Sequence, residues 1–367
     1  MIVRATTAPG IEDVARHEGC RLLGEAGLPG RAIDSDADSG FGLPGVVAWR
    51  LDPSVTFCRL RDAAPFAAAR SLFHVAVHVA EIAWDGAQLE ALVRGIATID
   101  LPEMRDAESF RVSCTRVGDH RFRSPDVERA VGTILHERYE TAVDLEEYAL
   151  HVKVDIAGAR AFCGYQLTRR KGLDRRYRWV YHPRVTLRTP IAYAMLVIAG
   201  YDRNPGALHD PFCGSGTILM EAAAIAREHE LSDELLSGSD RDPRSVEGAA
   251  LNLEAAGFPG VAVTQLDARE LSPSITEASL DFVVTNPPFG IRMAQGQSLY
   301  GLYRDFLAAA AHVLRPQGTL ALLVGRRRGE FNRVLRGYPE LALEHVRIIE
   351  MGGVYAALFV LRKRARD

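Results

Sequence analysis

Cysteine is scarce in this chain of 367 residues. The five cysteines are Cys20, Cys58, Cys114, Cys163 and Cys213, and no two of them form a CxxC pair. An odd and scattered set argues against a disulfide framework, and it lacks the spacing of a zinc knuckle. We therefore expect free thiols, buried or incidental, and no metal site.

Long apolar runs are absent as well. No run approaches the roughly 18 residues that would span a bilayer, and the first residues, MIVRATTAPGIEDVARHEG, lack the apolar core of a secretory signal. Apolar residues make up 47% of the chain and charged residues 25%, which is typical of a folded, soluble protein. The length predicts two or three domains, and the expected location is the cytoplasm.

The chain has no large excess of either charge, but one segment concentrates positive charge. The net charge of −3 does not by itself indicate a nucleic-acid binder. The segment TRRKGLDRRYR (168–178) carries six basic residues and one acid, so its own net charge is +5. Such a segment can hold phosphates, although a solvated basic loop fits the residues equally well. Its basic residues are Arg169, Arg170, Lys171, Arg175, Arg176 and Arg178.

Strand-like and helix-like segments alternate after residue 185. This alternation predicts a parallel sheet covered by helices on both faces. The last two strand-like segments, 341–353 and 354–363, have no helix between them and are joined at Gly352-Gly353, which predicts an antiparallel hairpin at the sheet edge. The other expected strands are 205–210, 234–240, 261–267, 280–286 and 318–325, and the expected helices are 216–230, 243–257 and 299–314.

The first half has a weaker pattern. Residues 110–116 and 148–158 are expected to form strands, and 124–140 a capped helix. The segment 26–45 is rich in Gly, Pro and Asp and predicts a loop or short hairpin. An α+β arrangement of one or two small units fits this pattern.

A glycine-rich turn, LHDPFCGSGT (208–217), lies between an expected strand and an expected helix. Such a turn lets a ligand approach the backbone and the helix N-terminus, at the carboxyl end of a parallel sheet. A P-loop is excluded because no Lys follows, and a dinucleotide fingerprint is disfavoured because its third glycine is Leu219. The acid at Asp210 suits a cationic ligand better than a pyrophosphate. S-adenosylmethionine (SAM) carries an ammonium and a sulfonium and has no phosphate.

Two further acids end the next strands. Asp240 can accept hydrogen bonds from ribose hydroxyls, and Asp267 can accept one from an adenine amine. Any one of these aspartates could be a helix N-cap or a turn acid. Three acids at the ends of successive strands favour a cofactor site.

The fourth strand ends in Asn286-Pro287-Pro288-Phe289. An exocyclic amine on a base is a poor nucleophile because its lone pair is delocalised into the ring. The Asn286 side-chain oxygen and the Pro287 carbonyl can each accept one N–H of such an amine, with the prolines fixing the acceptors in advance. Phe289 offers a flat face for a base removed from its stack. The alternative, an Asn-Pro turn with a core phenylalanine, does not explain its position after the glycine loop.

These motifs, in this order, resemble the class I SAM-dependent methyltransferases that modify amino groups. They are most similar to the THUMP-containing guanosine N2-methyltransferases of tRNA and large-subunit rRNA. Residues 110–135 resemble the core of a THUMP domain, and the basic segment resembles the connector that follows it. Residues 1–50 match only by position.

The resemblance implies roles for particular residues. It implies catalysis by Asn286, Pro287 and Phe289. It implies RNA contacts by the six basic residues of the connector and by Arg292, which follows the tetrapeptide. It implies SAM contacts by Asp210, Pro211, Cys213, Gly214, Gly216, Thr217, Asp240, Arg241, Asp267, Ala268 and Asn286.

The expected fold is α/β. A Rossmann-like methyltransferase domain (189–367), with a mostly parallel seven-stranded sheet and an antiparallel last hairpin, follows an α+β module. That module comprises a ferredoxin-like segment (1–55) and a THUMP domain (56–166), joined to the methyltransferase domain by the basic linker 167–188.

The expected reaction is methyl transfer from SAM to N2 of a guanosine in the acceptor-stem region of tRNA, by a monomer. Related tetrapeptides also occur in adenine-N6 and glutamine methyltransferases, so the motif selects a planar amine and the choice of guanine rests on the resemblance. A 23S rRNA substrate stays open, as does a non-catalytic RNA-binding protein. A nicotinamide oxidoreductase is disfavoured because it leaves the tetrapeptide unexplained.

Overall fold

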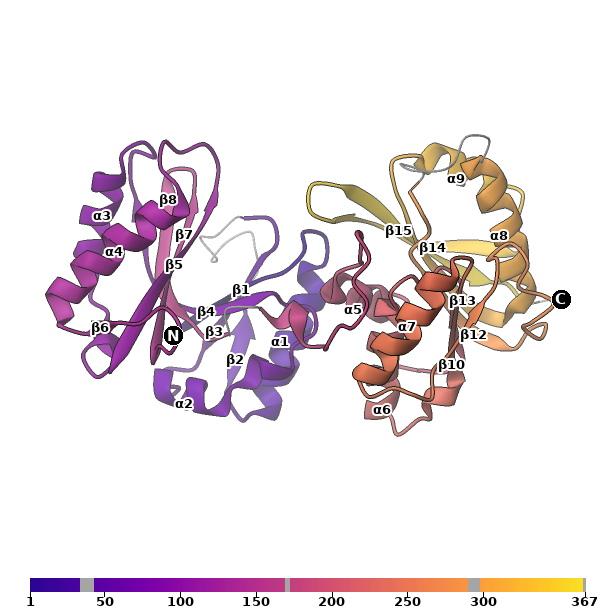
Figure 1. Cartoon of the computed structure of the whole chain (residues 1–367), viewed down its shortest axis with the longest axis horizontal. Coiled ribbons are helices and arrows are strands. Elements are labelled where there is room, and N and C mark those ends of the chain that lie inside the picture. Colours follow the sequence, from indigo (N-terminus) through magenta and orange to yellow (C-terminus); the bar gives the residue numbers. More distant parts are fainter. Residues whose placement is uncertain (34–42, 169–171, 290–297, 366–367) are drawn as a thin grey trace. The chain divides into compact units, whose positions relative to one another are not determined.

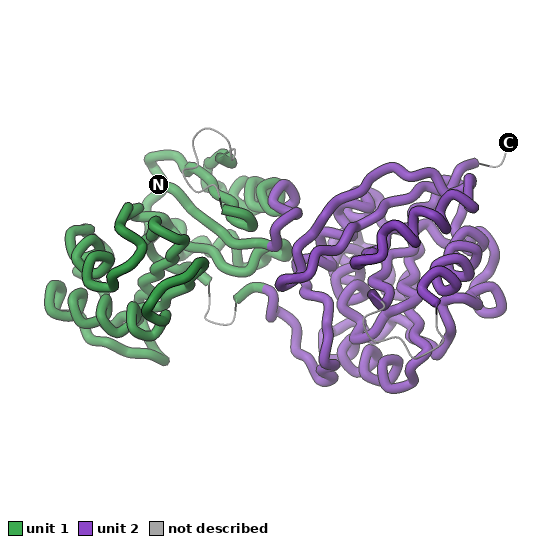
Figure 2. The backbone as a smooth tube through the Cα atoms, turned by 90° about the horizontal axis from the view of Figure 1, so that it is seen from above, with its two compact units in different colours: residues 1–7, 15–173 green, residues 8–14, 174–367 purple. Residues whose placement is uncertain are grey.

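The computed structural model describes residues 1–33, 43–168, 172–289 and 298–365. The chain forms two compact units (Figure 2). Unit 1 contains residues 1–7 and 15–173, and unit 2 contains residues 8–14 and 174–367. The passage from unit 1 to unit 2 falls inside the expected linker 167–188. The other expected domain boundaries stay predictions.

Unit 1 is built on an eight-stranded sheet with the order β2-β3-β1-β4-β8-β7-β5-β6. Strand β1 pairs with both β3 and β4, so the sheet runs without a break through the expected segments 1–55 and 56–166. The strands are β1 (Ile2–Thr6), β2 (Gly30–Ala32), β3 (Val46–Leu51), β4 (His74–Ala83), β5 (Ser109–Val117), β6 (Ala142–Val143), β7 (Leu150–Ala157) and β8 (Arg160–Gln166).

Helices α3 (Leu89–Ala97) and α4 (Ser124–Tyr139) lie on the same face of this sheet (Figure 1). The apolar positions of α4, Val127, Val131 and Leu135, recur at helical spacing and are buried against the sheet. The remaining helices of this half are α1 (Glu12–Glu25) and α2 (Phe57–Ala63).

The expected strands 110–116 and 148–158 and the helix 124–140 are confirmed as β5, β7 and α4. The capping at the start of α4 is also confirmed, because the Asp126 carboxylate accepts a hydrogen bond from the Arg123 backbone N–H at 2.8 Å. In the segment 26–45 the structure has only the short strand β2, and residues 34–42 lie outside the described residues.

Unit 2 is built on a seven-stranded sheet with the order β11-β10-β9-β12-β13-β15-β14, and only β14 and β15 pair as antiparallel strands with their neighbours. The strands are β9 (Leu208–Asp210), β10 (Leu236–Asp240), β11 (Ala262–Gln265), β12 (Leu280–Thr285), β13 (Leu314–Val324), β14 (Leu341–Glu350) and β15 (Tyr355–Lys363). The helices are α5 (Thr189–Ile198), α6 (Thr217–Glu228), α7 (Pro243–Ala255), α8 (Leu299–Val313) and α9 (Arg328–Leu335).

The expected fold class is confirmed in unit 2. The five parallel strands β9 to β13 are connected by helices except between β11 and β12, and the last two strands form the expected hairpin. Gly352 and Gly353 turn that hairpin with φ of 71° and 86°, in the left-handed region that a tight two-residue turn requires.

Helix α5 was not expected from the sequence. Its residues Thr189 to Leu196 are all buried, so it is apolar on every side. A helix of this kind has no polar face, and its sequence therefore shows no amphipathic period. None of the helices in the described parts of the chain is long and apolar enough to cross a membrane.

Candidate functional site

The candidate site lies where the order of the parallel strands reverses. From β9 the chain adds β10 and β11 on one side, and then returns to add β12 on the other side. Ligands of open α/β sheets bind at this switch point, beyond the carboxyl ends of the strands. Asp210, Asp240 and Thr285 are the last residues of β9, β10 and β12, so their side chains are placed at this edge.

A cavity of about 760 Å³ opens at this edge. Its walls are lined by every residue predicted to bind the cofactor except Gly216, and by the three predicted catalytic residues. The predicted residues in its lining are Asp210, Pro211, Cys213, Gly214, Thr217, Asp240, Arg241, Asp267, Ala268, Asn286, Pro287 and Phe289.

Gly216 has a different part in the site. It begins α6 with a φ of 82°, a conformation that a side chain would strain. The loop before it is held to β10, because the Cys213 N–H donates to the Ser239 carbonyl at 3.0 Å and the Gly214 N–H donates to the Asp240 carboxylate at 3.1 Å. The glycine loop therefore presents the N-terminus of α6 to the cavity.

Asp210 is the most deeply buried acid of the site, with 1% of its surface exposed. Its carboxylate accepts hydrogen bonds from the Thr285 hydroxyl at 2.6 Å and from the Phe212 N–H at 3.2 Å. Burial raises the pKa of Asp210 to about 7, because these two bonds only partly replace the water that the charged form loses. A cation beside this carboxylate would favour its ionised form.

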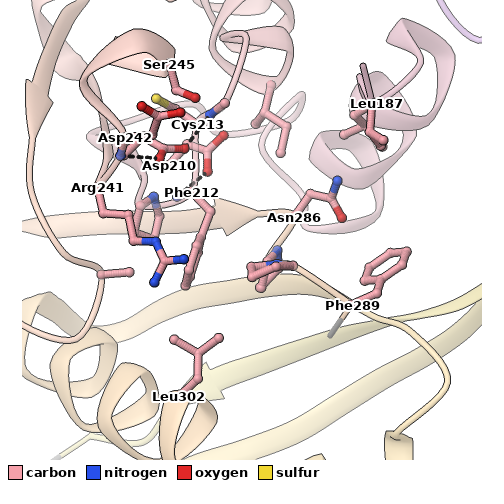
Figure 3. Close-up of a pocket in the computed structure, with 18 of the residues that line it drawn as sticks. Leu187, Asp210, Phe212, Cys213, Arg241, Asp242, Ser245, Asn286, Phe289 and Leu302 are labelled. Atoms are coloured by element: carbon pink, nitrogen blue, oxygen red, sulfur yellow. Dashed lines mark hydrogen bonds between the residues drawn. The ribbon is translucent and has the colours of Figure 1, made fainter. Parts of the chain in front are cut away.

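Asp240 lines the cavity, and the residues that follow it, Arg241 and Asp242, lie away from Asn286 in the view of Figure 3. One Asp240 oxygen is bound by the glycine loop, and the other accepts from the Asp242 N–H at 2.9 Å. Asp242 caps α7 by accepting from the Arg244 N–H at 3.1 Å. This end is therefore polar and acidic, as a site for sugar hydroxyls requires.

Asp267 is in the cavity wall, but its carboxylate is engaged with Arg269. The Arg269 Nη2 and Nε atoms lie 2.6 and 2.9 Å from the two Asp267 oxygens. This bidentate hydrogen bonding to the guanidinium lowers the pKa of Asp267, so the carboxylate is ionised. An adenine amine would have to share this acid with Arg269.

Asn286 stands at the other end of the cavity, and its amide oxygen is buried with no hydrogen-bond partner among the described residues. A buried carbonyl oxygen without a partner costs free energy, on the order of 1–3 kcal/mol. Such an oxygen in a cavity wall can therefore accept a hydrogen bond from a ligand.

Phe289 is half-buried and lies beside Asn286 (Figure 3). Its side chain packs closely against Gly325. A Cβ atom added at Gly325 would lie 2.7 Å from the Phe289 ring, so this glycine is what lets the ring occupy its place. Residue 325 follows the end of β13, so the ring lies at the edge of the sheet, where Phe289 forms part of the cavity lining.

The predicted RNA-binding residues separate into three groups. Arg169, Arg170, Lys171 and Arg292 lie outside the described residues. Arg175 and Arg178 are exposed. Arg176 instead turns inward, and its Nη2 lies 2.6 Å from a carboxylate oxygen of Glu221, a fully buried residue of α6.

Several residues of the cavity lining were not predicted from the sequence. Asp242 had a usable signal, since an acid directly before Pro243 is a typical helix start. The others had no motif of their own. They include Leu187, Ser245, Arg269, Leu302 and Met351.

The cysteines and possible metal ligands do not add chemistry to the site. Burial raises the pKa of the Cys213 thiol well above its usual value, and raises that of Cys163 to about 12. Neither thiol is a thiolate near neutral pH. Among the described residues, no group of three or more His, Cys, Asp or Glu side chains could hold a metal ion.

Comparison with known proteins agrees with this geometry. A family model described as the RMKL-like methyltransferase domain matches residues 175–357, and a THUMP domain model matches residues 86–163. The tRNA (guanine(6)-N2)-methyltransferase of Thermus thermophilus is 36% identical, covering 99% of this chain and 100% of the relative. The enzyme of the same name from Archaeoglobus fulgidus is 26% identical over 98% of this chain and 92% of its own length.

A solved structure extends the likeness to the whole fold. The crystal structure of TrmN from Thermus thermophilus matches with a TM-score of 0.73 and 34% identity, over 99% of each chain. The sheet order, the site and these matches define a class I methyltransferase with a THUMP domain. The chain belongs to the THUMP-containing family of tRNA guanine-N2 methyltransferases.

Proposed function

We propose that this protein transfers a methyl group from SAM to the exocyclic N2 atom of a guanosine in tRNA. The observation that carries the proposal is the buried Asn286 amide oxygen, which has no described partner and shares a cavity with Asp210 and Asp240. The full-length relatives are named for guanine 6, and we therefore propose position 6, in the acceptor-stem region, as the target.

The residues of the cavity fit SAM by their chemistry. Asp210 would hold the ammonium, Asp240 the ribose hydroxyls and Asp267 the adenine amine. The glycine loop, Pro211 to Thr217, would pack along the cofactor, with Arg241 and Ala268 completing the wall. When bound, SAM supplies an electrophilic methyl group on a sulfonium, and the C–S bond breaks as the N–C bond forms.

Asn286 and Pro287 prepare the amine for this transfer. Each oxygen accepts one N–H, which leaves the nitrogen lone pair directed away from the ring and toward the methyl group. The prolines hold both oxygens in place, so that the acceptors need no reorganisation at the moment of reaction. The nitrogen carries a positive charge after transfer and then releases its proton to water, so no general base is required.

Phe289 and the connector bring the substrate to this point. The guanine would leave its stack and lie against the Phe289 ring, a contact that bases of any kind tolerate. The exposed Arg175 and Arg178 would contact phosphates, together with Arg169, Arg170, Lys171 and Arg292.

Transfer of a labelled methyl group to unmodified tRNA and to rRNA, assayed separately, tests the proposal. We expect label in tRNA only, and nucleoside digestion should yield N2-methylguanosine from position 6. Label in 23S rRNA alone would replace tRNA by rRNA as the substrate. A protein that binds tRNA but neither binds SAM nor transfers the label would be a non-catalytic RNA-binding protein.

The raised pKa of Asp210 predicts a pH-dependent affinity for SAM. Only the ionised carboxylate pairs with the ammonium, and at pH 6 most Asp210 side chains keep their proton because the pKa is about 7. We expect the affinity to rise about five- to tenfold between pH 6 and pH 7.5. Calorimetric titration should show this rise in the wild type and a weak, flat affinity in Asp210→Asn.

The same substitution should stabilise the protein without ligand. The folded pKa of Asp210 lies above the unfolded value of about 3.8, so its contribution to stability is present at low pH and is lost as pH rises toward 7. Asp210→Asn removes that loss, and its Tm at pH 8 should exceed that of the wild type. An equal Tm together with a flat wild-type affinity would show that Asp210 is already ionised at pH 6.

The oligomeric state and location belong to this proposal too. We propose a monomer in the cytoplasm, where its tRNA substrate is available. Light scattering on the full chain and fractionation of cells test these two statements.

A further inference from the structure

One buried amide on α7 is hydrogen-bonded to two separate walls of the site. Asn252 has 0% of its surface exposed. Its side-chain oxygen accepts from the backbone N–H groups of Val180 and Tyr181, at 2.8 and 2.9 Å. Its side-chain nitrogen donates to the carbonyls of Tyr181 and Ser215, at 3.1 and 3.0 Å. Every donor and acceptor of this amide is therefore used, and the two segments that it joins are the glycine loop and the connector, which here includes the whole linker 167–188.

The connector is fixed to α6 and α7 at further points. The Tyr181 ring lies over Gly248, one turn before Asn252, where a Cβ atom would come within 2.2 Å of the ring. Arg176 is paired with the buried Glu221 of α6, and the Tyr177 hydroxyl donates to the Met220 carbonyl at 3.4 Å. Residues 176–181 are thus held against α6 and α7 of unit 2 by these contacts.

The connector reaches functional parts of unit 2 on both sides of these contacts. Beyond Tyr181 it continues to Val185, Thr186 and Leu187, which line the cavity. Arg175, directly before the packed segment, and Arg178, within it, are exposed and form no ion pair within the described parts of the chain. The segment therefore joins two free cations to the wall of the cofactor site.

We propose that Asn252 is a positioning residue that couples RNA binding on the connector to cofactor binding in the cavity. The proposal rests on the function proposed above. Phosphates bound by Arg175 and Arg178 hold the connector in place, and Asn252 transmits that restraint to the Ser215 carbonyl and the glycine loop. The loop then has less freedom to lose when the cofactor binds, so RNA and cofactor bind with positive cooperativity.

Titration with S-adenosylhomocysteine (SAH), with and without saturating unmodified tRNA transcript, measures this coupling without turnover. In the wild type we expect tRNA to tighten SAH binding by about fivefold or more, within the range typical of linked sites. In Asn252→Ala the effect of tRNA should fall below twofold, and SAH binding without tRNA should weaken. In the double variant Arg175→Ala/Arg178→Ala, SAH binding without tRNA should equal that of the wild type, while the effect of tRNA is lost.

A second variant separates the two halves of the amide. Asn252→Asp keeps the acceptor for the Val180 and Tyr181 N–H groups, so the connector stays attached, and replaces the amide donor to the Tyr181 and Ser215 carbonyls, which removes the bond to the glycine loop. It should fold and should lose the coupling, which keeps the test decisive if Asn252→Ala does not fold. Leu253→Ala is the matched control, because Leu253 is a buried neighbour on α7 with 1% exposure and its loss should leave the coupling intact.

The outcomes distinguish the coupling from the function itself. A wild-type enzyme that methylates tRNA, but whose SAH affinity is unchanged by tRNA, would overturn the coupling and leave the function standing. Full coupling in Asn252→Asp would also overturn it. Absence of both methyl transfer and SAH binding in the wild type would instead overturn the function.

Discussion

Asn286→Ala should lower kcat for tRNA methylation by about 10²- to 10³-fold, the loss typical when one preorganised polar group of a reaction centre is removed. The physical reason is that the buried Asn286 oxygen has no described protein partner, so the only interaction that it can lose is with the ligand. The fold should not suffer, since truncation also removes an unsatisfied buried acceptor. Single-turnover methyl transfer to tRNA at saturating SAM measures the loss, so that a weaker cofactor contact in the variant does not enter it.

Two further variants make this test specific. Asn286→Asp keeps an acceptor oxygen in place and should retain more activity than the alanine variant. Asn332→Ala removes an exposed amide of α9 outside the cavity lining and should be indistinguishable from the wild type. If folded Asn286→Ala methylates tRNA at the wild-type rate, Asn286 has no part in catalysis.

The sequence was sufficient to predict the part of the site that lies at strand ends. Asp210, Asp240 and Asn286 end short strand-like segments, and parallel strands bring their carboxyl ends to one edge whatever the details of packing. Their meeting in one cavity could therefore be predicted from the order of the motifs. Local patterns also predicted the hairpin at Gly352-Gly353, because a two-residue turn determines its own geometry.

The rest of the site depends on contacts between segments far apart in the chain. Leu187 and Met351 reach the cavity from the connector and from the end of β14, and no spacing rule joins them to Asp210. The Asp267–Arg269 pair was missed for a different reason. A carboxylate at a strand end predicts an acceptor, but whether a nearby guanidinium already uses it depends on side-chain conformation.

The connector shows the same limit most clearly. The sequence alone does not distinguish Arg175, Arg176 and Arg178, which are all arginines of one basic segment. In the structure, only Arg176 among these three faces the protein interior. What distinguishes it from its neighbours is its partner Glu221, the buried one of the two acids of the largely apolar helix α6. A buried charge in such a helix requires a counter-charge, but the sequence does not say which of the arginines supplies it.

Arg176→Ala should therefore destabilise the protein, by about 3–5 kcal/mol, the cost typical of leaving one charge of a buried pair without its partner. The Arg176 Nη2 and Nε atoms lie 2.6 and 3.1 Å from one Glu221 oxygen, and Glu221 is fully buried. Arg178→Ala is the matched control, since an exposed arginine should change the free energy of unfolding by less than about 0.5 kcal/mol. Urea denaturation at neutral pH measures both.

Replacing the acid as well tests the cause of the loss. Glu221→Gln keeps the shape of the side chain and removes the charge that Arg176 compensates, so the double variant Arg176→Ala/Glu221→Gln should recover much of the lost stability. Comparing this double variant with Arg178→Ala also separates a role of Arg176 in packing from a role in RNA contact. Arg178→Ala should weaken tRNA binding without loss of stability, whereas Arg176→Ala/Glu221→Gln should bind tRNA nearly as well as the wild type if Arg176 serves the fold. Equal losses of stability in Arg176→Ala and Arg178→Ala would contradict the assignment and return Arg176 to the set of phosphate-binding residues.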